Sequence, residues 1–263
     1  MPPPSYNHLV PKMRINRALA KLGYGSRRSV EELVRAGKVR VNGAVVTDLA
    51  TQVDPERDRI TVAGRKAPRQ SSSPHVSAFY KPRGVLSTWK DERGRKCLAD
   101  YFMSRGAERV FAVGRLDRDS EGLLLITNDG ELAHRLMHPS FEVPRTYEVT
   151  VSPQPDADAL ERLSSVTKLP DGPVQPLHVK LRGIKGAESV VAVTLTEGRN
   201  RLVRRMFTAH GFEVLRLRRV RFGAVLLGRL KPGENRQLSA VEVRRLNAQA
   251  TPQHGRPKKP AVL

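Results

Sequence analysis

The segment from Gly114 to Leu132, GRLDRDSEGLLLITNDGEL, holds the densest group of side chains able to do acid, base or nucleophilic chemistry. A carboxylate can attack an electrophilic carbon or accept a proton, provided that its surroundings keep it ionised. Spacing alone does not choose among the candidates, which are Asp117, Asp119, Glu121, Asp129 and Glu131.

Asp117 differs from the other carboxylates in its position. It follows the apolar run VFAV, closes a predicted strand and stands between Arg115 and Arg118. Flanking cations would keep a partly buried carboxylate ionised at neutral pH. An aspartate between arginines is also typical of a structural ion pair. The spacing of these residues therefore leaves both a catalytic and a structural role open for Asp117.

Two of the other carboxylates have conformational explanations. Asp119, next to Ser120, suits a cap or a local side-chain hydrogen bond. The tripeptide Asn128-Asp129-Gly130 follows the apolar run LLLIT and is typical of a hairpin turn, which would give Asp129 a conformational role.

Basic residues gather in a second segment, EGRNRLVRRMF, from Glu197 to Phe207. Its spacing predicts an amphipathic helix with an apolar face and a basic face. Eight arginines lie between Arg199 and Arg221, a density suited to phosphates or to a carboxylate held in bidentate fashion. A third candidate is Tyr147, which begins the predicted strand RTYEVTV and whose ring could equally be part of a core.

Residues 76–247 mix strand-like runs with fewer helical ones, which predicts an α+β fold with a largely antiparallel sheet. In EVLRLRRVRFG the apolar residues change parity between Leu217 and Val220. A bulge near Arg218-Arg219 would restore the register.

Residues 12–64 are expected to form a small separate domain. Ile15, Leu19 and Leu22 share one face of a first helix, and Ser26 caps a second helix that ends near Gly37. Asn42-Gly43 between β-branched runs predicts a hairpin. Residues 65–75 have the composition of a linker, whereas residues 1–11 and 248–263 are expected to be disordered.

The composition indicates a polyanionic partner. Of the 263 residues, 47 are Lys or Arg and 26 are Asp or Glu, giving a formal net charge of +21. The chain lacks an 18-residue apolar run and a signal-peptide pattern, so we expect no membrane attachment and a cytoplasmic protein. Cys97 is the single cysteine, and the dispersed histidines lack zinc spacing, so neither a disulfide nor a metal site is expected.

The N-terminal pattern RINRALAKLGYGSRRSVEELVRAGKVRVNG resembles the alpha-L RNA-binding domain, the S-four type. In that family the second helix and the hairpin grip structured RNA through phosphate contacts. The resemblance implies that the RNA contacts here include Arg17, Arg27, Arg28, Lys38 and Arg40.

The motifs GRLDRDSEGLLLITNDG, PRTYEV, EGRNRLVRRMF, LRLRRVRFG and LKPGENRQL, in this order, resemble the RsuA/RluB family of ribosomal RNA pseudouridine synthases over roughly residues 13–246. The resemblance implies that Asp117 is the catalytic aspartate, Tyr147 stacks on the target base, Arg204 pairs with Asp117 and Leu217 closes the apolar side of the pocket. It implies no cofactor and no metal. Further RNA contacts are expected from Arg115, Arg199, Arg201 and Arg205.

The expected partner is ribosomal RNA, bound by a monomer in a ribosome-assembly intermediate. The basic segment, in the form EGRNR…VRRMF, resembles the family members that act on large-subunit (23S) rRNA more than those that act on small-subunit (16S) rRNA. Arg145, Leu202 and Ser120 depart from the usual family residues, and Leu202 bears on local RNA contacts. Two alternatives remain, a non-catalytic ribosome-assembly protein and a base-excising glycosylase, which would release free uracil.

Overall fold

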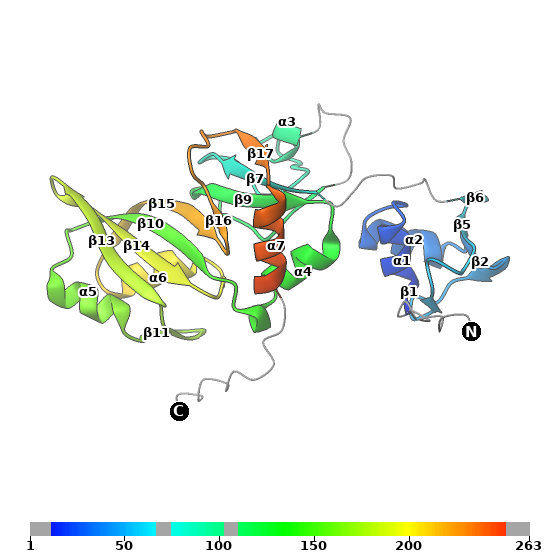
Figure 1. Ribbon diagram of the computed structural model, residues 1–263, viewed down its shortest axis with the longest axis horizontal. Coiled ribbons are helices and arrows are strands. Elements are labelled where there is room, and N and C mark those ends of the chain that lie inside the picture. The colour runs from blue at the N-terminus through cyan, green and yellow to red at the C-terminus, as the bar shows by residue number, and fades with distance from the viewer. Residues whose placement is uncertain (1–11, 67–74, 103–109, 251–263) are drawn as a thin grey trace, which may run out of the picture. The chain divides into compact units, whose positions relative to one another are not determined.

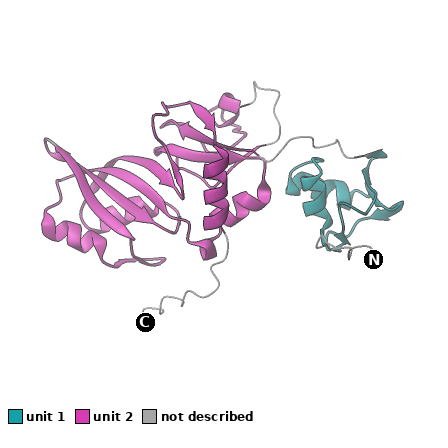
Figure 2. Cartoon of the chain, viewed as in Figure 1, with its two compact units in different colours: residues 1–73 teal, residues 74–263 magenta. Residues whose placement is uncertain are grey.

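The computed structural model describes residues 12–66, 75–102 and 110–250, which divide between two compact units, Met1–Ser73 and Pro74–Leu263 (Figure 2). The predicted N-terminal tail, most of the predicted linker and residues 251–263 of the predicted C-terminal tail lie outside the described residues. In the described part of the chain, the last helix ends at Gln249, and the next residue, Ala250, is buried. The folded part therefore continues three residues past the predicted start of the tail, because Ala250 packs in the core.

The two helices of the first unit are those that the apolar spacing predicts (Figure 1). They are α1 (Ile15–Lys21) and α2 (Arg27–Arg35). Ser26 caps α2 by accepting a hydrogen bond from the Ser29 amide at 3.1 Å, as predicted. The inward faces of both helices are buried in one apolar cluster, which stabilises this small unit.

The strands of the first unit include the predicted hairpin. Asn42 and Gly43 have φ values of 53° and 92°, the left-handed conformations that a tight two-residue turn requires. One sheet has the order β3-β2-β5-β6, and β1 pairs with β4. The bounds are β1 (Met13–Arg14), β2 (Val39–Val41), β3 (Ala44–Val46), β4 (Gln52–Val53), β5 (Ile60–Val62) and β6 (Arg65–Lys66).

The second unit is built on one mixed, mostly antiparallel sheet with the order β13-β14-β10-β15-β9-β7-β17, in which only β15 and β9 pair in parallel among the described strands (Figure 1). β16 adds to β15 and β8 to β9, while β11 and β12 form a separate hairpin. The α+β prediction is confirmed. The bounds are β7 (Val76–Lys81), β8 (Phe111–Ala112), β9 (Glu121–Thr127), β10 (Arg145–Ser152), β11 (Thr167–Leu169), β12 (Gly172–Val174), β13 (His178–Lys185), β14 (Glu188–Leu195), β15 (Glu213–Phe222), β16 (Val225–Leu226) and β17 (Asn235–Gln237).

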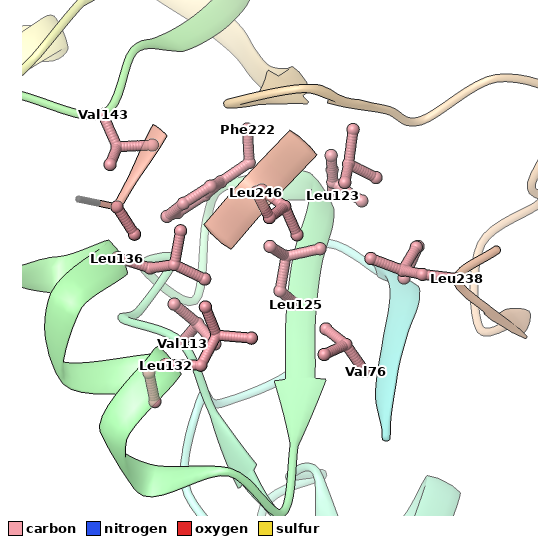
Figure 3. Packing of buried hydrophobic residues seen from close by; sticks show 14 of the residues in the cluster. Val76, Val113, Leu123, Leu125, Leu132, Leu136, Val143, Phe222, Leu238 and Leu246 are labelled. Carbon is pink, nitrogen blue, oxygen red and sulfur yellow. The ribbon is translucent and has the colours of Figure 1, made fainter. Parts of the chain in front are cut away.

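Helices close the apolar faces of this sheet. Leu132, Leu136 and Leu246 from two helices converge on Leu123 and Leu125 of β9 (Figure 3). A second cluster lies between α5, α6 and the strands β10, β14 and β15. The bounds are α3 (Ala99–Phe102), α4 (Gly130–Met137), the 3-10 turn η1 (Pro139–Phe141), α5 (Ala157–Ser164), α6 (Leu202–Ala209) and α7 (Ala240–Gln249).

Asn128-Asp129-Gly130 does not form the predicted hairpin turn. Asp129 instead caps α4 by accepting hydrogen bonds from the amides of Glu131 and Leu132, both at 3.0 Å. The residues that follow have helical apolar spacing, which explains why a turn sequence begins a helix here. The conformational role predicted for Asp129 is confirmed.

The register of β15 against β10 changes at two places, which leave Leu215 and Val220 without a partner in the ladder. The bulge predicted near Arg218-Arg219 therefore exists and is centred on Val220. It allows Leu217 and Phe222 both to be buried although they differ in parity.

Gly122 allows β9 and β15 to approach closely at their parallel pairing. Its φ is 102°, and a Cβ atom built on it would lie 2.4 Å from the carbonyl oxygen of Arg219. Only glycine fits both the conformation and the space. This contact fixes where β9 begins, and with it the end of the loop that carries Asp117.

Candidate active site

Asp117 lies in the loop between β8 and β9, not at the end of a strand as predicted. Hydrogen bonds from the end of β7 and from the segment after it fasten this loop, and three of them are 2.7 Å long. The Gly84 amide donates to the Arg118 carbonyl at 2.7 Å, and the Ser87 hydroxyl donates to the Leu116 carbonyl at 2.7 Å. The third comes from Lys81 to the Ser120 carbonyl, also at 2.7 Å. A short loop tied at both ends can hold a side chain in one position.

Lys81 is completely buried at the base of this loop. Its ammonium donates to the carbonyls of Pro82, at 3.0 Å, and of Ser120. Burial lowers the pKa of Lys81 to about 8, and the nearby carboxylates of Asp117, Asp119 and Glu121 oppose this shift. Lys81 thus places a positive charge behind three carboxylates.

The depressed pKa of Lys81 predicts a rise of stability with pH. Between about pH 8 and pH 10.5 the unfolded chain keeps a proton that the folded protein releases, so folding becomes more favourable as pH rises through this window. The measurement is urea unfolding of wild type and Lys81→Met at several pH values. Between about pH 8 and pH 10.5, the free energy of unfolding of wild type should rise relative to that of Lys81→Met by up to roughly 3 kcal/mol. The control is Lys180→Met, at an exposed position on β13. Equal pH slopes for wild type and Lys81→Met would contradict the account.

The side chain of Asp117 is 34% exposed, and the nearest cation is not one of its neighbours in sequence. Arg115 and Arg118 are exposed, and neither forms an ion pair with Asp117 in the described part of the chain. The Nη1 atom of Arg201 lies 3.8 Å from Oδ2 of Asp117. The cation beside this carboxylate therefore comes from the start of α6, a long-range contact that local sequence does not reveal.

Asp119 contacts two arginines and is more than the local cap predicted. Arg201 donates to its two carboxylate oxygens at 3.3 and 3.0 Å, and Nε of Arg204 lies 3.2 Å from Oδ2. Burial raises the pKa of Asp119, but the hydrogen bond from Arg201 and the charges of both arginines outweigh it and hold the pKa below its usual value. Asp119 is therefore ionised at neutral pH.

The predicted pairing of Arg204 with Asp117 is not among the ion pairs of the described residues. Arg204 pairs with Asp119, because its guanidinium is fixed by bonds from Nη1 to the Val214 carbonyl, at 2.9 Å, and from Nη2 to the Asp119 carbonyl, at 3.1 Å. Burial lowers the pKa of Arg204, whereas the carboxylates of Asp119 and Asp117 raise it. Arg204 thus acts on Asp117 through its charge.

An apolar wall adjoins the carboxylates. Leu116, next to Asp117 in the loop, packs in one cluster with Tyr147 of β10 and Leu217 of β15. Tyr147 is 8% exposed and Leu217 is 6% exposed. The predicted site residues Asp117, Tyr147, Arg204 and Leu217 thus lie on elements that share one core.

Arg199 and Arg205 are held by internal acceptors, which argues against the predicted RNA contacts. Nε, Nη1 and Nη2 of Arg199 all donate, to Glu197, Asp171 and the carbonyls of the hairpin turn. Arg205 makes two hydrogen bonds to the Asp171 carboxylate, at 2.7 and 2.8 Å. The sequence offered no sign of this because Asp171 lies in a separate hairpin. These arginines join the β11–β12 hairpin to the start of α6.

The cations predicted for RNA contact in the first unit are exposed. They are Arg17, Arg27, Arg28, Lys38 and Arg40. Arg40 donates to the Gly43 carbonyl at 2.9 Å and so stays close to the hairpin turn. Exposed cations on α1, α2 and the hairpin suit contacts with phosphates.

Sequence reasoning missed three residues that build the site: Lys81, Ser87, and Asp119 in its role as acceptor for two arginines. It also missed Asp171, which joins the β11–β12 hairpin to α6 through Arg199 and Arg205. The signal for Lys81 was its position at the end of the strand-like run VSAFYK. In the structure this run is β7, and all six of its residues are buried, Lys81 included. In the described residues no cluster of three or more His, Cys, Asp or Glu side chains could hold a metal ion. None of the helices in those residues is long and apolar enough to cross a membrane.

Comparison with known proteins identifies related chains for both units. Residues 75–209 match the RNA pseudouridylate synthase family, and residues 13–60 match the S4 domain. The chain is 42% identical to ribosomal large subunit pseudouridine synthase B of Bacillus subtilis over 92% of this chain and 98% of that protein. It is 43% identical to the protein of the same name from Salmonella typhimurium, over 81% of this chain and 75% of that protein. A crystal structure of a pseudouridylate synthase is similar with a TM-score of 0.61 and 27% identity, covering 89% of this chain and 99% of that one.

Proposed function

The chain belongs to the RNA pseudouridylate synthase family, and from this premise we propose that it converts a uridine of large-subunit (23S) ribosomal RNA to pseudouridine, with Asp117 as the essential residue. The observation that carries the proposal is the position of Asp117. It stands on a fastened loop in which its neighbour Leu116 packs in the same apolar cluster as Tyr147, and Arg201 lies 3.8 Å from its carboxylate. The names of the Bacillus and Salmonella relatives support the large subunit as the target.

The proposed reaction is an isomerisation in which no atom is gained or lost overall. The bond from ribose C1′ to uracil N1 breaks, the base turns within the pocket, and C1′ joins C5. The hydrogen on C5 leaves as a proton, and N1 gains one. Asp117 suits either of two initial steps, attack on C1′ or removal of the 2′ proton.

The surroundings of Asp117 meet the needs of this reaction. Arg201 and Arg204 offset the cost of holding an anion in a pocket from which RNA excludes water. The apolar side chains of Leu116 and Leu217 help to exclude water from the detached base. A detached base exposed to water would be lost as uracil, which is the outcome of the glycosylase alternative.

We assign Tyr147 the role of the aromatic platform for the flipped uridine. Stacking of a base on an aromatic ring contributes roughly 1 to 3 kcal/mol, which corresponds to about 5- to 150-fold in kcat/KM. Tyr147→Leu should lose activity in this range, and Tyr147→Phe should stay within about threefold of wild type. The measurement is kcat/KM on an rRNA fragment with thermal unfolding of each variant. Equal activity of the Leu and Phe variants would remove Tyr147 from this role.

The first unit is assigned the binding of structured rRNA through the exposed cations of α1, α2 and the hairpin. The proposed substrate places the protein in the cytoplasm, where a monomer would act on a ribosome-assembly intermediate. The test of the target is to incubate the enzyme with 23S and 16S transcripts and to map pseudouridine in each. Modification confined to the 16S transcript would replace the large-subunit target by the small-subunit one. Binding without modification of either RNA would favour a non-catalytic assembly protein.

A further inference from the structure

We propose that Asp119 is a positioning residue, which holds Arg201 away from Asp117 and so keeps the Asp117 carboxylate available to the substrate. This inference rests on the proposed function, which assigns the chemistry to Asp117. Within the described residues no hydrogen bond reaches the Asp117 carboxylate, and its nearest cation stops at 3.8 Å. The same cation is bound to Asp119 at 3.0 Å.

Arg201 and Arg204 depend on Asp119 to different degrees. Arg204 is anchored by two backbone carbonyls, of Val214 and of Asp119, and its side chain is 12% exposed. Replacing the carboxylate of Asp119 leaves both of these anchors intact. Among the described residues, the hydrogen bonds of the Arg201 side chain all go to the Asp119 carboxylate. That side chain is 44% exposed, so loss of the carboxylate releases Arg201 and leaves Arg204 in place.

A released Arg201 has a nearby destination. Its Nη1 atom already lies 3.8 Å from Asp117, so a rotation of the side chain suffices to form a direct, hydrogen-bonded ion pair. Arginine can bind both oxygens of a carboxylate at once, and such bonds occupy the lone pairs that would attack carbon or accept a proton. Asp119 prevents this by offering Arg201 a competing carboxylate.

The first test is Asp119→Asn, which removes the charge and keeps the shape. We expect kcat on an rRNA fragment to fall roughly 10- to 100-fold, because Asp117 must break hydrogen bonds to a charged group before it reacts. KM should change less than about threefold, since RNA binding is not what is lost. A higher KM for the rRNA fragment with an unchanged kcat would overturn the inference.

The second test is rescue by removal of the released arginine. In the Asp119→Asn background, adding Arg201→Gln should raise kcat at least about fivefold above the single variant, because no side chain is then left to occupy Asp117. If Asp119 had only a structural role, the double variant should have a lower kcat than Asp119→Asn, because it loses further contacts. A double variant no faster than Asp119→Asn would overturn the inference.

The matched control is Asp171→Asn, because Asp171 also holds two arginines but in the hairpin turn before β12. It should lower the melting temperature while kcat stays within about twofold of wild type. If Asp119→Asn does not fold, Asp119→Glu keeps the carboxylate and should retain kcat within about fivefold, and a loss as large as that expected for Asn would overturn the inference. Full activity of Asp117→Asn would instead remove the premise, whereas an inactive Asp117→Asn beside a fully active Asp119→Asn would reject this inference alone.

Discussion

Asp117→Asn is expected to lower kcat for pseudouridine formation by roughly 10³-fold or more while the affinity for RNA stays within about threefold. An amide can neither attack C1′ nor remove the 2′ proton, so the change eliminates both proposed initial steps. The fold should tolerate it. Asp117 is about one third exposed and its one ion pair among the described residues spans 3.8 Å, a contact that contributes little to stability.

The control for this variant is Asp129→Asn, the same chemical change later in the same stretch of sequence. Asp129 caps α4, and asparagine is an equally good cap, so kcat and stability should both stay close to wild type. Single-turnover rates on an rRNA fragment, together with RNA affinity and thermal unfolding, compare the two variants. If Asp117→Asn keeps even a tenth of the wild-type rate, the chemistry belongs to another residue.

Arg204→Gln is expected to lower kcat by roughly 10²- to 10³-fold, and Arg204→Lys by about 10- to 100-fold. The guanidinium of Arg204 reaches the Val214 carbonyl, the Asp119 carbonyl and the Asp119 carboxylate together. An ammonium carries the charge but cannot make these three contacts in one plane. Glutamine loses the charge as well, and leaves the negative charges of Asp117 and Asp119 less compensated.

The control for the two Arg204 variants is Arg236→Lys. Arg236 binds Glu242 with two hydrogen bonds on the surface beside α7, so that substitution breaks a similar fork away from the site. Its kcat should remain within about twofold of wild type. Rates and melting temperatures of the Arg204 variants show whether lost activity exceeds lost stability. Equal rates for wild type and Arg204→Lys would mean that charge alone is required.

Local elements of the fold were predictable because their signals lie within a few residues. The Ser26 cap, the Asn42-Gly43 turn and the bulge in β15 follow from capping, from backbone conformation and from the period of a strand. Asp129 shows the limit of such signals, because the same three residues suit a hairpin turn or a helix cap. Only the packing of α4 on β9 decides between them.

The partners of the charged residues were less predictable, because they join segments far apart in the chain. The arginines next to Asp117 in sequence point outward, whereas Arg201 and Arg204 reach the loop from α6. The identity of the four proposed site residues came from a family resemblance. Pattern and charge could not have shown that Arg204 contacts Asp119, nor that Arg199 and Arg205 are held by Asp171.

The most direct test of the central claim is the fate of an rRNA uridine labelled with tritium at C5. The wild-type protein, incubated with a 23S transcript so labelled, should release tritium to water in proportion to the pseudouridine formed, without free uracil, and Asp117→Asn should release none above background. Absence of tritium release by wild type on any bacterial rRNA, or release of free uracil in its place, would contradict the assignment of this protein as a uridine isomerase that acts through Asp117.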